Sequence, residues 1–287
     1  MHSLLESRQH KTESGFPILN GTSVFWIRPA SRNALQRNGL VTFDDFMRCH
    51  GEVVDANSRS QVKYVTFEDH PGAYLKTHRN NFRRVNLFSK VPLIKIELEN
   101  ISRLAMAGFT NLEPIAFGWH EKCSFLMLKE LVGFISLDKW LMLPSSSRRE
   151  TRMRLSKALA SMLSSMHEAG ICHRDLFSWH VFIKDDGMLN IQPIDLERMK
   201  TKNAFPLSSW HFNRNKLRDI AALNLTMPWP QVTSAERLRF FLAYLDSPYL
   251  TDEHRKMLKQ IIAIAKRMAG RRKFRSYGVA SRLLRAS

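Results

Sequence analysis

The stretch GICHRDLFSWHVFIKDDGMLNIQPIDLERM, residues 170–199, decides how this chain is expected to fold. It places the tripeptide His-Arg-Asp, residues 173–175, between a long helical pattern and two short apolar runs. The sequence Asp-Asp-Gly that separates those runs is typical of a β-hairpin turn. Such a hairpin would return Asp195 to the loop that carries Asp175. The two acids are therefore either the carboxylates of a phosphoryl-transfer site or ordinary loop acids beside a basic surface.

Charge is the unusual feature of the composition. The 287 residues include 44 Lys and Arg against 26 Asp and Glu, a net charge of +18. Residues 1–130 hold 17 basic and 13 acidic side chains, whereas residues 131–287 hold 27 and 13. A polarised basic surface suits a polyanion, whether nucleic acid, an anionic membrane face or a phosphorylated glycolipid. Charge alone does not choose between these partners.

The chain shows no sign of a secretory signal or a membrane-spanning segment. Its N-terminus lacks an apolar core, and no run approaches the roughly 18 apolar residues of a membrane helix. The three cysteines are far apart, odd in number and free of Cys-x-x-Cys spacing, which is typical of thiols in a reducing compartment. We expect a cytoplasmic protein that contacts a membrane only at its surface.

The pattern predicts an α+β fold of two lobes. Residues 46–130 read as a β-rich N-lobe, with a three-stranded meander, one helix and two more strands. Residues 131–287 read as a larger α-helical C-lobe, and residues 1–45 as an N-terminal extension of open role. This order of elements resembles the protein-kinase-like fold, in which a ligand binds in the cleft between the lobes.

Two charged side chains of the N-lobe fit that comparison. Lys76 lies on the third strand, where it would point toward nucleotide phosphates, although a lone strand lysine is more often simply exposed. Glu97 shares a helix face with Ile101 and Leu104, and a carboxylate on a core face requires a partner. We therefore expect a Lys76–Glu97 ion pair, the alternative being that Glu97 lies at the solvated edge of that face.

The remaining candidates lie at the passage between the lobes and in the catalytic loop. The main chain of Glu130, Leu131 and Val132 would hold the adenine of ATP. Asp175 would accept the proton of the acceptor hydroxyl, or orient that hydroxyl. His173 would brace the loop, and Arg174 would lie near acidic groups.

Several residues depart from the protein-kinase pattern. The fifth residue after Asp175 is His180 instead of a magnesium-binding Asn, so it either binds the metal weakly or braces the loop, and Asp195 carries most of the Mg²⁺ binding. Asp195 is followed by Leu196 and Glu197 in place of Phe and Gly, which argues against a flipping activation segment. The loop at 55–61 has no glycine, so Ser58, Ser60 or backbone amides would have to cover the phosphates.

A further Asp limits the kind of acceptor. Asp219 opens an apolar helix and resembles the kinase residue that holds the catalytic-loop backbone. It follows Asp195 by only 24 positions, too short an interval for a full peptide-docking segment. The spacing favours a compact or lipid-linked acceptor over a protein.

The motifs HRDLFSWHVFI and IDLERM, with YLKTHR and LKELVGFISLDKWL, resemble the lipopolysaccharide kinase family of Gram-negative bacteria, which includes WaaP-type core heptose kinases and Kdo kinases. The resemblance covers about residues 51–225. It implies ATP- and Mg²⁺-dependent phosphorylation of a sugar hydroxyl in the inner core, with an anionic glycolipid or phosphorylated sugar as substrate at the cytoplasmic face of the inner membrane. The alternatives are a kinase-like protein without activity and a protein kinase. A nucleic-acid-binding protein is not expected, because the chain carries no recognised nucleic-acid motif.

Overall fold

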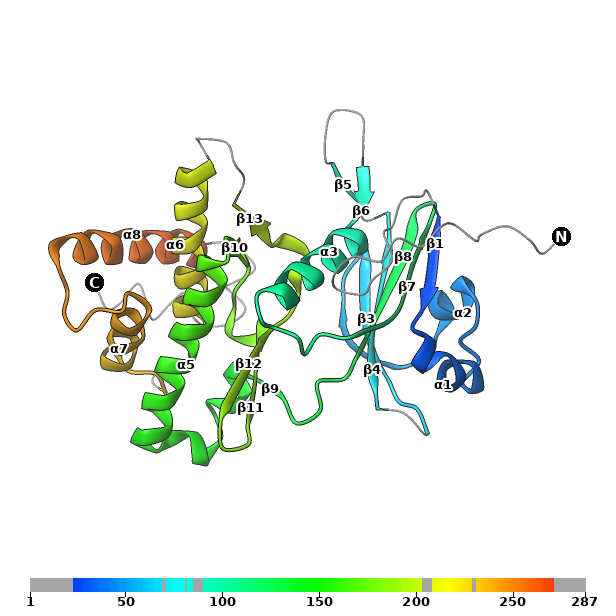
Figure 1. Ribbon diagram of the computed structural model, residues 1–287, viewed down its shortest axis with the longest axis horizontal. Coiled ribbons are helices and arrows are strands. Elements are labelled where there is room, and N and C mark those ends of the chain that lie inside the picture. Colours follow the sequence, from blue (N-terminus) through cyan, green and yellow to red (C-terminus); the bar gives the residue numbers. More distant parts are fainter. Residues whose placement is uncertain are drawn as a thin grey trace. The chain divides into compact units, whose positions relative to one another are not determined.

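The structure is a computed structural model that describes residues 23–68, 71–80, 82–84, 90–202, 208–228 and 231–270. The chain divides into two compact units, Met1–Val132 and Gly133–Ser287, which are each drawn as a ribbon in Figure 1. The division falls two residues beyond the predicted end of the N-lobe at residue 130. The mixed composition of helices and antiparallel sheet agrees with the predicted α+β class.

The N-terminal unit is built on a six-stranded sheet in the order β1-β7-β8-β4-β3-β2, in which every neighbouring pair is antiparallel. The predicted meander forms β2 to β4, and the two later strands form β7 and β8. A separate two-stranded ribbon is made of β5 and β6. The bounds of the strands are β1 Val24–Ile27, β2 Glu52–Ala56, β3 Ser60–Val65, β4 Ala73–Arg79, β5 Phe82–Arg84, β6 Lys90–Pro92, β7 Pro114–His120 and β8 Cys123–Lys129.

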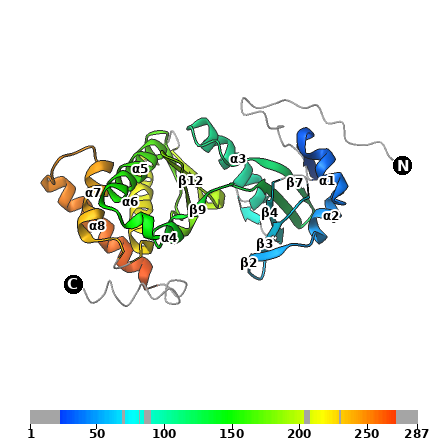
Figure 2. The ribbon, with the colours of Figure 1, turned by 90° about the horizontal axis from the view of Figure 1, so that it is seen from below.

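Part of the predicted N-terminal extension belongs to this unit. Strand β1 pairs with β7, and after a short 3-10 turn (η1, Pro29–Ser31) the helices α1 (Arg32–Arg37) and α2 (Phe43–Arg48) cover one face of the sheet (Figures 1 and 2). The Phe46 ring stacks on Phe125 of β8 with a centroid distance of 4.5 Å. The described residues before 46 are therefore part of the N-terminal core, which differs from the extension that the sequence suggested.

Helix α3 (Leu93–Met106) covers the opposite face of the sheet, against β7 and β8 (Figure 1). Pro92 is its N-cap residue, and the buried face includes Ile94, Leu98, Ile101 and Leu104, as the spacing predicts. The chain leaves the helix through Gly108, whose φ of +94° is accessible to glycine at little cost. Glu97 lies on the same buried face.

The C-terminal unit is mainly helical. Its helices are α4 Leu137–Trp140, α5 Arg149–Glu168, α6 Ser208–Thr226, α7 Ser234–Tyr244 and α8 Asp252–Ala269, with 3-10 turns η2 Pro144–Ser147, η3 Ser178–His180 and η4 Leu196–Arg198. Helix α7 packs on α5 and α8 packs on α6 (Figures 1 and 2). The predicted hairpin is β11 (Val181–Asp185) and β12 (Leu189–Pro193), extended by β9 (Ile135–Ser136), while β10 (Ile171–Cys172) pairs with β13 (Lys200–Thr201).

A cavity of about 270 Å³ lies among α5, α6, α7 and α8. Its walls are mostly aliphatic and phenyl side chains, including Leu159, Leu223 and Phe241. None of the site residues that the sequence predicts lines it. No helix in the described residues is long and apolar enough to cross a membrane.

Replacing Phe46 by Ala is expected to lower the free energy of unfolding of the N-terminal unit by about 3–5 kcal/mol, because it leaves a cavity beneath the stacked Phe125 ring. Urea unfolding of the full chain, followed by circular dichroism, measures the change. Val41→Ala, at an exposed position next to α2, is the control and should stay within about 0.5 kcal/mol of wild type. Equal effects of the two substitutions would mean that α2 is not part of the core.

Candidate active site

The predicted ion pair of the N-terminal unit is present. On β4, Leu75 faces the core beneath α1 and α2, so Lys76 faces α3 on the other side of the sheet. The Lys76 Nζ lies 3.0 Å from Oε2 of Glu97, whose side chain is almost completely buried. A buried carboxylate is costly unless it is paired, and the lysine provides that partner. The lysine stays partly exposed and can also contact an anion.

The main chain expected to hold adenine is already partly engaged. The Glu130 N–H donates to the Gly72 carbonyl at 2.8 Å, and the Val132 N–H donates to the Glu130 carbonyl at 3.1 Å. A base binding at Glu130, Leu131 and Val132 would therefore use the main-chain groups that these two bonds leave available, or replace the longer bond. The Glu130 side chain accepts a hydrogen bond from the Tyr64 hydroxyl at 2.8 Å, a contact that the sequence did not indicate.

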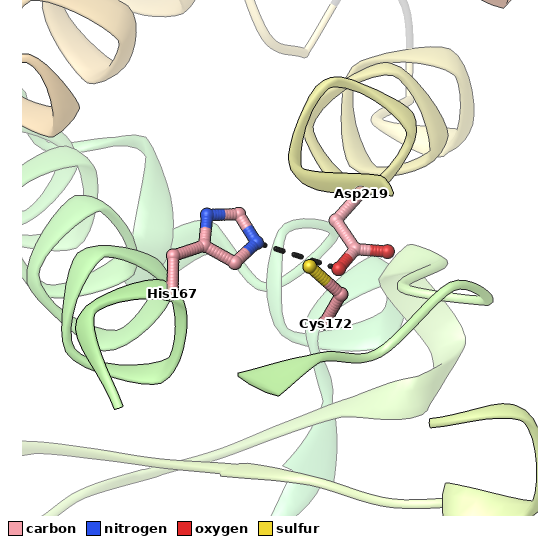
Figure 3. A group of neighbouring side chains, drawn as sticks. All are labelled: His167, Cys172 and Asp219. Atoms are coloured by element: carbon pink, nitrogen blue, oxygen red, sulfur yellow. Dashed lines mark hydrogen bonds and ion pairs between the residues drawn. The ribbon is translucent and has the colours of Figure 1, made fainter. Parts of the chain in front are cut away.

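A buried carboxylate anchors the backbone of the catalytic loop. Asp219 on α6 accepts hydrogen bonds from the backbone N–H of His173 at 2.7 Å and of Arg174 at 2.5 Å. The Asp219 Oδ2 also lies 3.4 Å from Nε2 of His167 on α5, as Figure 3 shows. The other ring nitrogen of His167 lies 2.8 Å from the Tyr244 hydroxyl on α7. The prediction that Asp219 holds the loop backbone is confirmed, and the two supporting residues are additions to it.

The group His167, Cys172 and Asp219 (Figure 3) has the residue types of a metal site, and one potential ligand atom of each residue lies within 4.8 Å of the others. Burial raises the pKa of the Cys172 thiol well above its usual range, so this side chain stays protonated and is a poor metal ligand. Both Asp219 oxygens already accept backbone N–H bonds. Asp219 and His167 therefore form a hydrogen-bonded support for the loop, whereas the Cys172 thiol donates to the Phe212 carbonyl.

A second set of bonds joins the catalytic loop to the segment that carries Asp195. The His173 Nε2 lies 2.9 Å from the Ile194 carbonyl, and the Ile194 N–H donates to the His180 carbonyl at 2.9 Å. Arg174 and Asp195 both adopt left-handed backbone conformations, with φ of +70° and +60°. Such conformations are costly for residues other than glycine and persist where surrounding bonds impose them. The His173 side chain thus joins the catalytic loop to the segment that carries Asp195.

Two arginines from outside the loop contact Asp175. The Nε of Arg198 lies 3.0 Å from Oδ2, and a terminal nitrogen of Arg218 lies 3.7 Å from Oδ1. The Asp175 Oδ1 is buried and has no hydrogen-bond partner among the described residues. Neither arginine could be assigned to Asp175 from the sequence, because nothing in local spacing indicates that η4 and α6 reach the same carboxylate.

Arg174 was expected beside acidic groups, and the structure differs. Its guanidinium makes no ion pair with the carboxylates of the described residues, and its Nε is buried without a hydrogen-bond partner there. The reason lies in the left-handed backbone, which directs the Arg174 N–H to Asp219 and its carbonyl to Nε of Arg218 at 3.0 Å. Arg218 and Arg198 hold the positions beside Asp175 instead.

His180 connects the backbone of Asp175 to the carboxylate of Asp195. Its Nδ1 lies 2.8 Å from the Asp175 backbone carbonyl, and its Nε2 lies 3.6 Å from Oδ2 of Asp195. Desolvation lowers the pKa of His180, so the neutral imidazole is favoured. Because the carbonyl can only accept, Nδ1 carries the proton, and the Nε2 lone pair faces Asp195. A nitrogen and a carboxylate oxygen in this arrangement can share a cation.

The turn between β2 and β3 is closed by a side chain in place of glycine. The Asn57 Oδ1 accepts from the N–H of Arg59 at 2.9 Å and of Ser60 at 3.0 Å, and its Nδ2 donates to the Ser60 hydroxyl at 2.6 Å. The Arg59 and Ser60 amides, which were expected to cover phosphates, are thus engaged within the turn itself. The Ser60 hydroxyl accepts a bond there and keeps its own O–H donor. Ser58 lies at its exposed tip.

Comparison with known proteins extends these observations. The model of the lipopolysaccharide kinase (Kdo/WaaP) family matches residues 45–244, more than half of the chain. The chain belongs to this family. The match runs from α2 through α7 and includes both the Lys76–Glu97 pair and the catalytic loop, while α8 lies outside it. The resemblance seen in the sequence is confirmed.

Curated relatives of the chain are named as lipopolysaccharide core heptose(I) kinases WaaP. The protein of Pseudomonas aeruginosa PAO1 is 29% identical over 232 residues, which cover 74% of this chain and 83% of the relative. The protein of Escherichia coli K12 is 26% identical over 231 residues, covering 73% and 83%. Another from Escherichia coli is 27% identical over 193 residues, covering 61% and 71%.

Replacing Asp219 by Ala is expected to speed amide exchange at His173 and Arg174 by about ten- to a hundredfold, because a hydrogen bond to a charged acceptor contributes roughly 1.5–3 kcal/mol. Hydrogen–deuterium exchange of peptides covering residues 171–176 measures the change. Asp219→Asn keeps one carbonyl acceptor and should give an intermediate rate, and Asp186→Ala, in the hairpin turn, should have no effect there. Unchanged exchange in both Asp219 variants would contradict the anchoring role.

Proposed function

We propose that this chain is an ATP-dependent kinase that phosphorylates a sugar hydroxyl of the lipopolysaccharide inner core, on heptose or Kdo, or of a related glycolipid. One observation carries the proposal. The loop with Asp175 and the segment with Asp195 are fixed to each other through His173 and His180. Membership of the lipopolysaccharide kinase family supports the assignment of phosphoryl transfer to this pair of acids.

Asp175 is the proposed acceptor of the hydroxyl proton. Its Oδ2 is held by the Nε of Arg198, and its buried Oδ1 has no hydrogen-bond partner among the described residues, so the carboxylate keeps unused acceptor capacity for the proton. In the transfer, the bond from the sugar oxygen to the γ-phosphorus forms and the bond from that phosphorus to the β-phosphate oxygen breaks. The proton passes to Asp175 and ADP leaves.

Asp195 and His180 are the proposed metal-binding residues. The Asp195 carboxylate and the Nε2 lone pair of His180, 3.6 Å apart, fit a shared divalent cation. Mg²⁺ prefers oxygen ligands, so Asp195 would be the stronger ligand of the two. When bound, the ion neutralises the negative charge of the nucleotide phosphates. The hydrogen bond of His180 to the Asp175 carbonyl fixes the imidazole orientation for this role.

Lys76 is the proposed phosphate-binding cation of the N-terminal unit, with Glu97 holding its ammonium group. The main chain of residues 130–132 is the proposed adenine contact. The short interval from Asp195 to Asp219 supports a compact or glycolipid acceptor over a protein. His173 keeps its proposed role as a loop brace, and Arg174 contributes its backbone N–H to the anchor on Asp219.

Turnover with purified inner-core acceptors tests this function. Asp175→Ala is expected to lower kcat by about 10²–10⁴, as for loss of a general base. Asp195→Asn is expected to raise the Mg²⁺ concentration needed for half-maximal turnover, because the variant loses a carboxylate ligand. The measurement is ADP release together with transfer of labelled phosphate to the acceptor. Asp186→Ala is the control. If wild type and Asp175→Ala consumed ATP equally, the catalytic assignment would be wrong, and a wild type that bound Mg-ATP without turnover would be an inactive kinase-like protein.

We also propose that α8 contacts an anionic membrane surface, in line with a peripheral position on the cytoplasmic face of the inner membrane. Lys259, Ile262 and Lys266 are spaced to share one face of this helix, and Ile262 is 42% exposed although it is apolar. An exposed aliphatic side chain between two cations suits the boundary between anionic headgroups and acyl chains.

The double variant Lys259→Glu/Lys266→Glu is expected to lose at least about tenfold in affinity for vesicles of phosphatidylglycerol and phosphatidylethanolamine, because each lysine near such a surface contributes about 1 kcal/mol. Co-sedimentation measures the affinity, with phosphatidylcholine vesicles as the neutral reference. Lys122→Glu/Lys139→Glu makes the same charge change at exposed positions elsewhere. Equal losses in the two double variants would assign the binding to net charge and overturn the role of α8.

A further inference from the structure

The catalytic loop brings no cation of its own to the position beside Asp175. The residues between Asp175 and His180 are Leu, Phe, Ser and Trp. The cation nearest to the carboxylate comes from the 3-10 turn η4, where Arg198 follows the metal-binding candidate Asp195 by three positions. One short segment therefore supplies both a carboxylate for the metal and a guanidinium for Asp175.

Arg198 uses only one edge of its guanidinium in this contact. Its Nε lies 3.0 Å from the Asp175 Oδ2, and within the described part of the chain its terminal amino groups make no hydrogen bond or ion pair. The side chain is 57% exposed. A guanidinium carries five N–H donors in a planar fork, so four remain for another acceptor.

Arg218 differs from Arg198 in this respect. Its side chain is 20% exposed, and its Nε donates to the Arg174 carbonyl at 3.0 Å. Its terminal nitrogen is 3.7 Å from Asp175, beyond hydrogen-bond distance. Arg218 thus supports the loop, whereas Arg198 presents donors toward solvent next to the same carboxylate.

The Asp175 side chain is only 8% exposed, so the Nε contact of Arg198 compensates the desolvation of that carboxylate. This compensation uses one of the five donors and gives no role to the other four. Phosphoryl transfer, in contrast, spreads negative charge over the three non-bridging oxygens of the group in flight, and fixed donors beside that charge lower the barrier. A guanidinium fork matches phosphate oxygens in geometry. The donors of Arg198 lie next to Asp175, the proposed acceptor of the hydroxyl proton. The hydroxyl oxygen that loses this proton attacks the phosphorus, so these donors would lie near the transferred group.

We propose that Arg198 is a catalytic residue that holds Asp175 through Nε while its terminal amino groups bind a non-bridging oxygen of the transferred phosphoryl group. This inference rests on the proposed kinase function. Arg198 neither gains nor loses a proton in the step, because guanidinium stays charged. Its contribution is to orient the acceptor carboxylate and to stabilise the developing charge at the same time.

Kinetics of Arg198→Ala give the first test. We expect kcat to fall by about 10²–10³, as for removal of one fixed donor from a charge-stabilising site, with the KM values for nucleotide and sugar acceptor changed less than about threefold. Arg198→Lys should recover about tenfold of the loss, since one ammonium cannot fill both contacts. Arg154→Ala is the matched control: its guanidinium, 42% exposed, lies 3.2 Å from Asp185, away from the loop, and kcat should be unchanged.

Binding of a phosphoryl mimic gives the second test, which does not depend on turnover. Wild type should bind Mg-ADP with aluminium fluoride more tightly than Mg-ADP alone, as a transition-state mimic is bound. Arg198→Ala should lose at least about tenfold in affinity for the fluoride complex, while Mg-ADP alone stays within about threefold. Isothermal titration calorimetry measures both.

The outcomes separate the two proposals. If Arg198→Ala binds the fluoride complex as wild type does, the phosphoryl contact is absent and the inference is overturned, even if kcat falls through Asp175. If Arg198→Ala loses affinity for both ligands equally, the side chain serves nucleotide binding and the inference fails as well. If wild type binds neither Mg-ADP nor its fluoride complex, the kinase function itself fails.

Discussion

The site of the C-terminal unit depends on one buried carboxylate. Asp219 accepts the N–H groups of His173 and Arg174, and these bonds hold Arg174 in a left-handed conformation that it would not adopt unaided. A carboxylate buried this completely must itself be compensated, and the two N–H donors with His167 provide that compensation. Asp175, one residue later, takes its position from this turn. The orientation of the proposed catalytic acid is thus set on α6.

The N-terminal unit solves a similar problem with an ion pair. Glu97 is placed on the buried face of α3 by helical spacing alone, and the desolvation of its carboxylate would be unfavourable without Lys76. Breaking such a pair costs more than the pair contributes, because the remaining charge is left buried. The lysine is therefore fixed where its ammonium group can also meet phosphate, and one interaction serves both folding and the proposed binding.

Much of this could be predicted from local pattern. The hairpin β11–β12 and the buried face of α3 follow from periodicities and turn residues that lie within one segment. The Lys76–Glu97 pair joins two elements and was predicted from the buried helix face together with the resemblance to the kinase fold. The contacts of Arg198 with Asp175, and of Tyr244 with His167, also join separate elements, and no local spacing indicates them. The pairing of β1 with β7 was not predicted for the same reason. A four-residue strand with a weak pattern is stabilised mainly by its partner strand, which its own sequence does not indicate.

The absence of glycine at two positions has a common physical consequence. In the β2–β3 turn, Asn57 supplies by side-chain hydrogen bonds what a glycine would supply by conformational freedom, so the turn is fixed. After Asp195, the chain continues into Leu196, which is completely buried. Rotating that segment outward would expose the leucine, at a cost of about 1.5–3 kcal/mol. Arg198 lies on the same 3-10 turn, so the burial of Leu196 holds Arg198 beside Asp175.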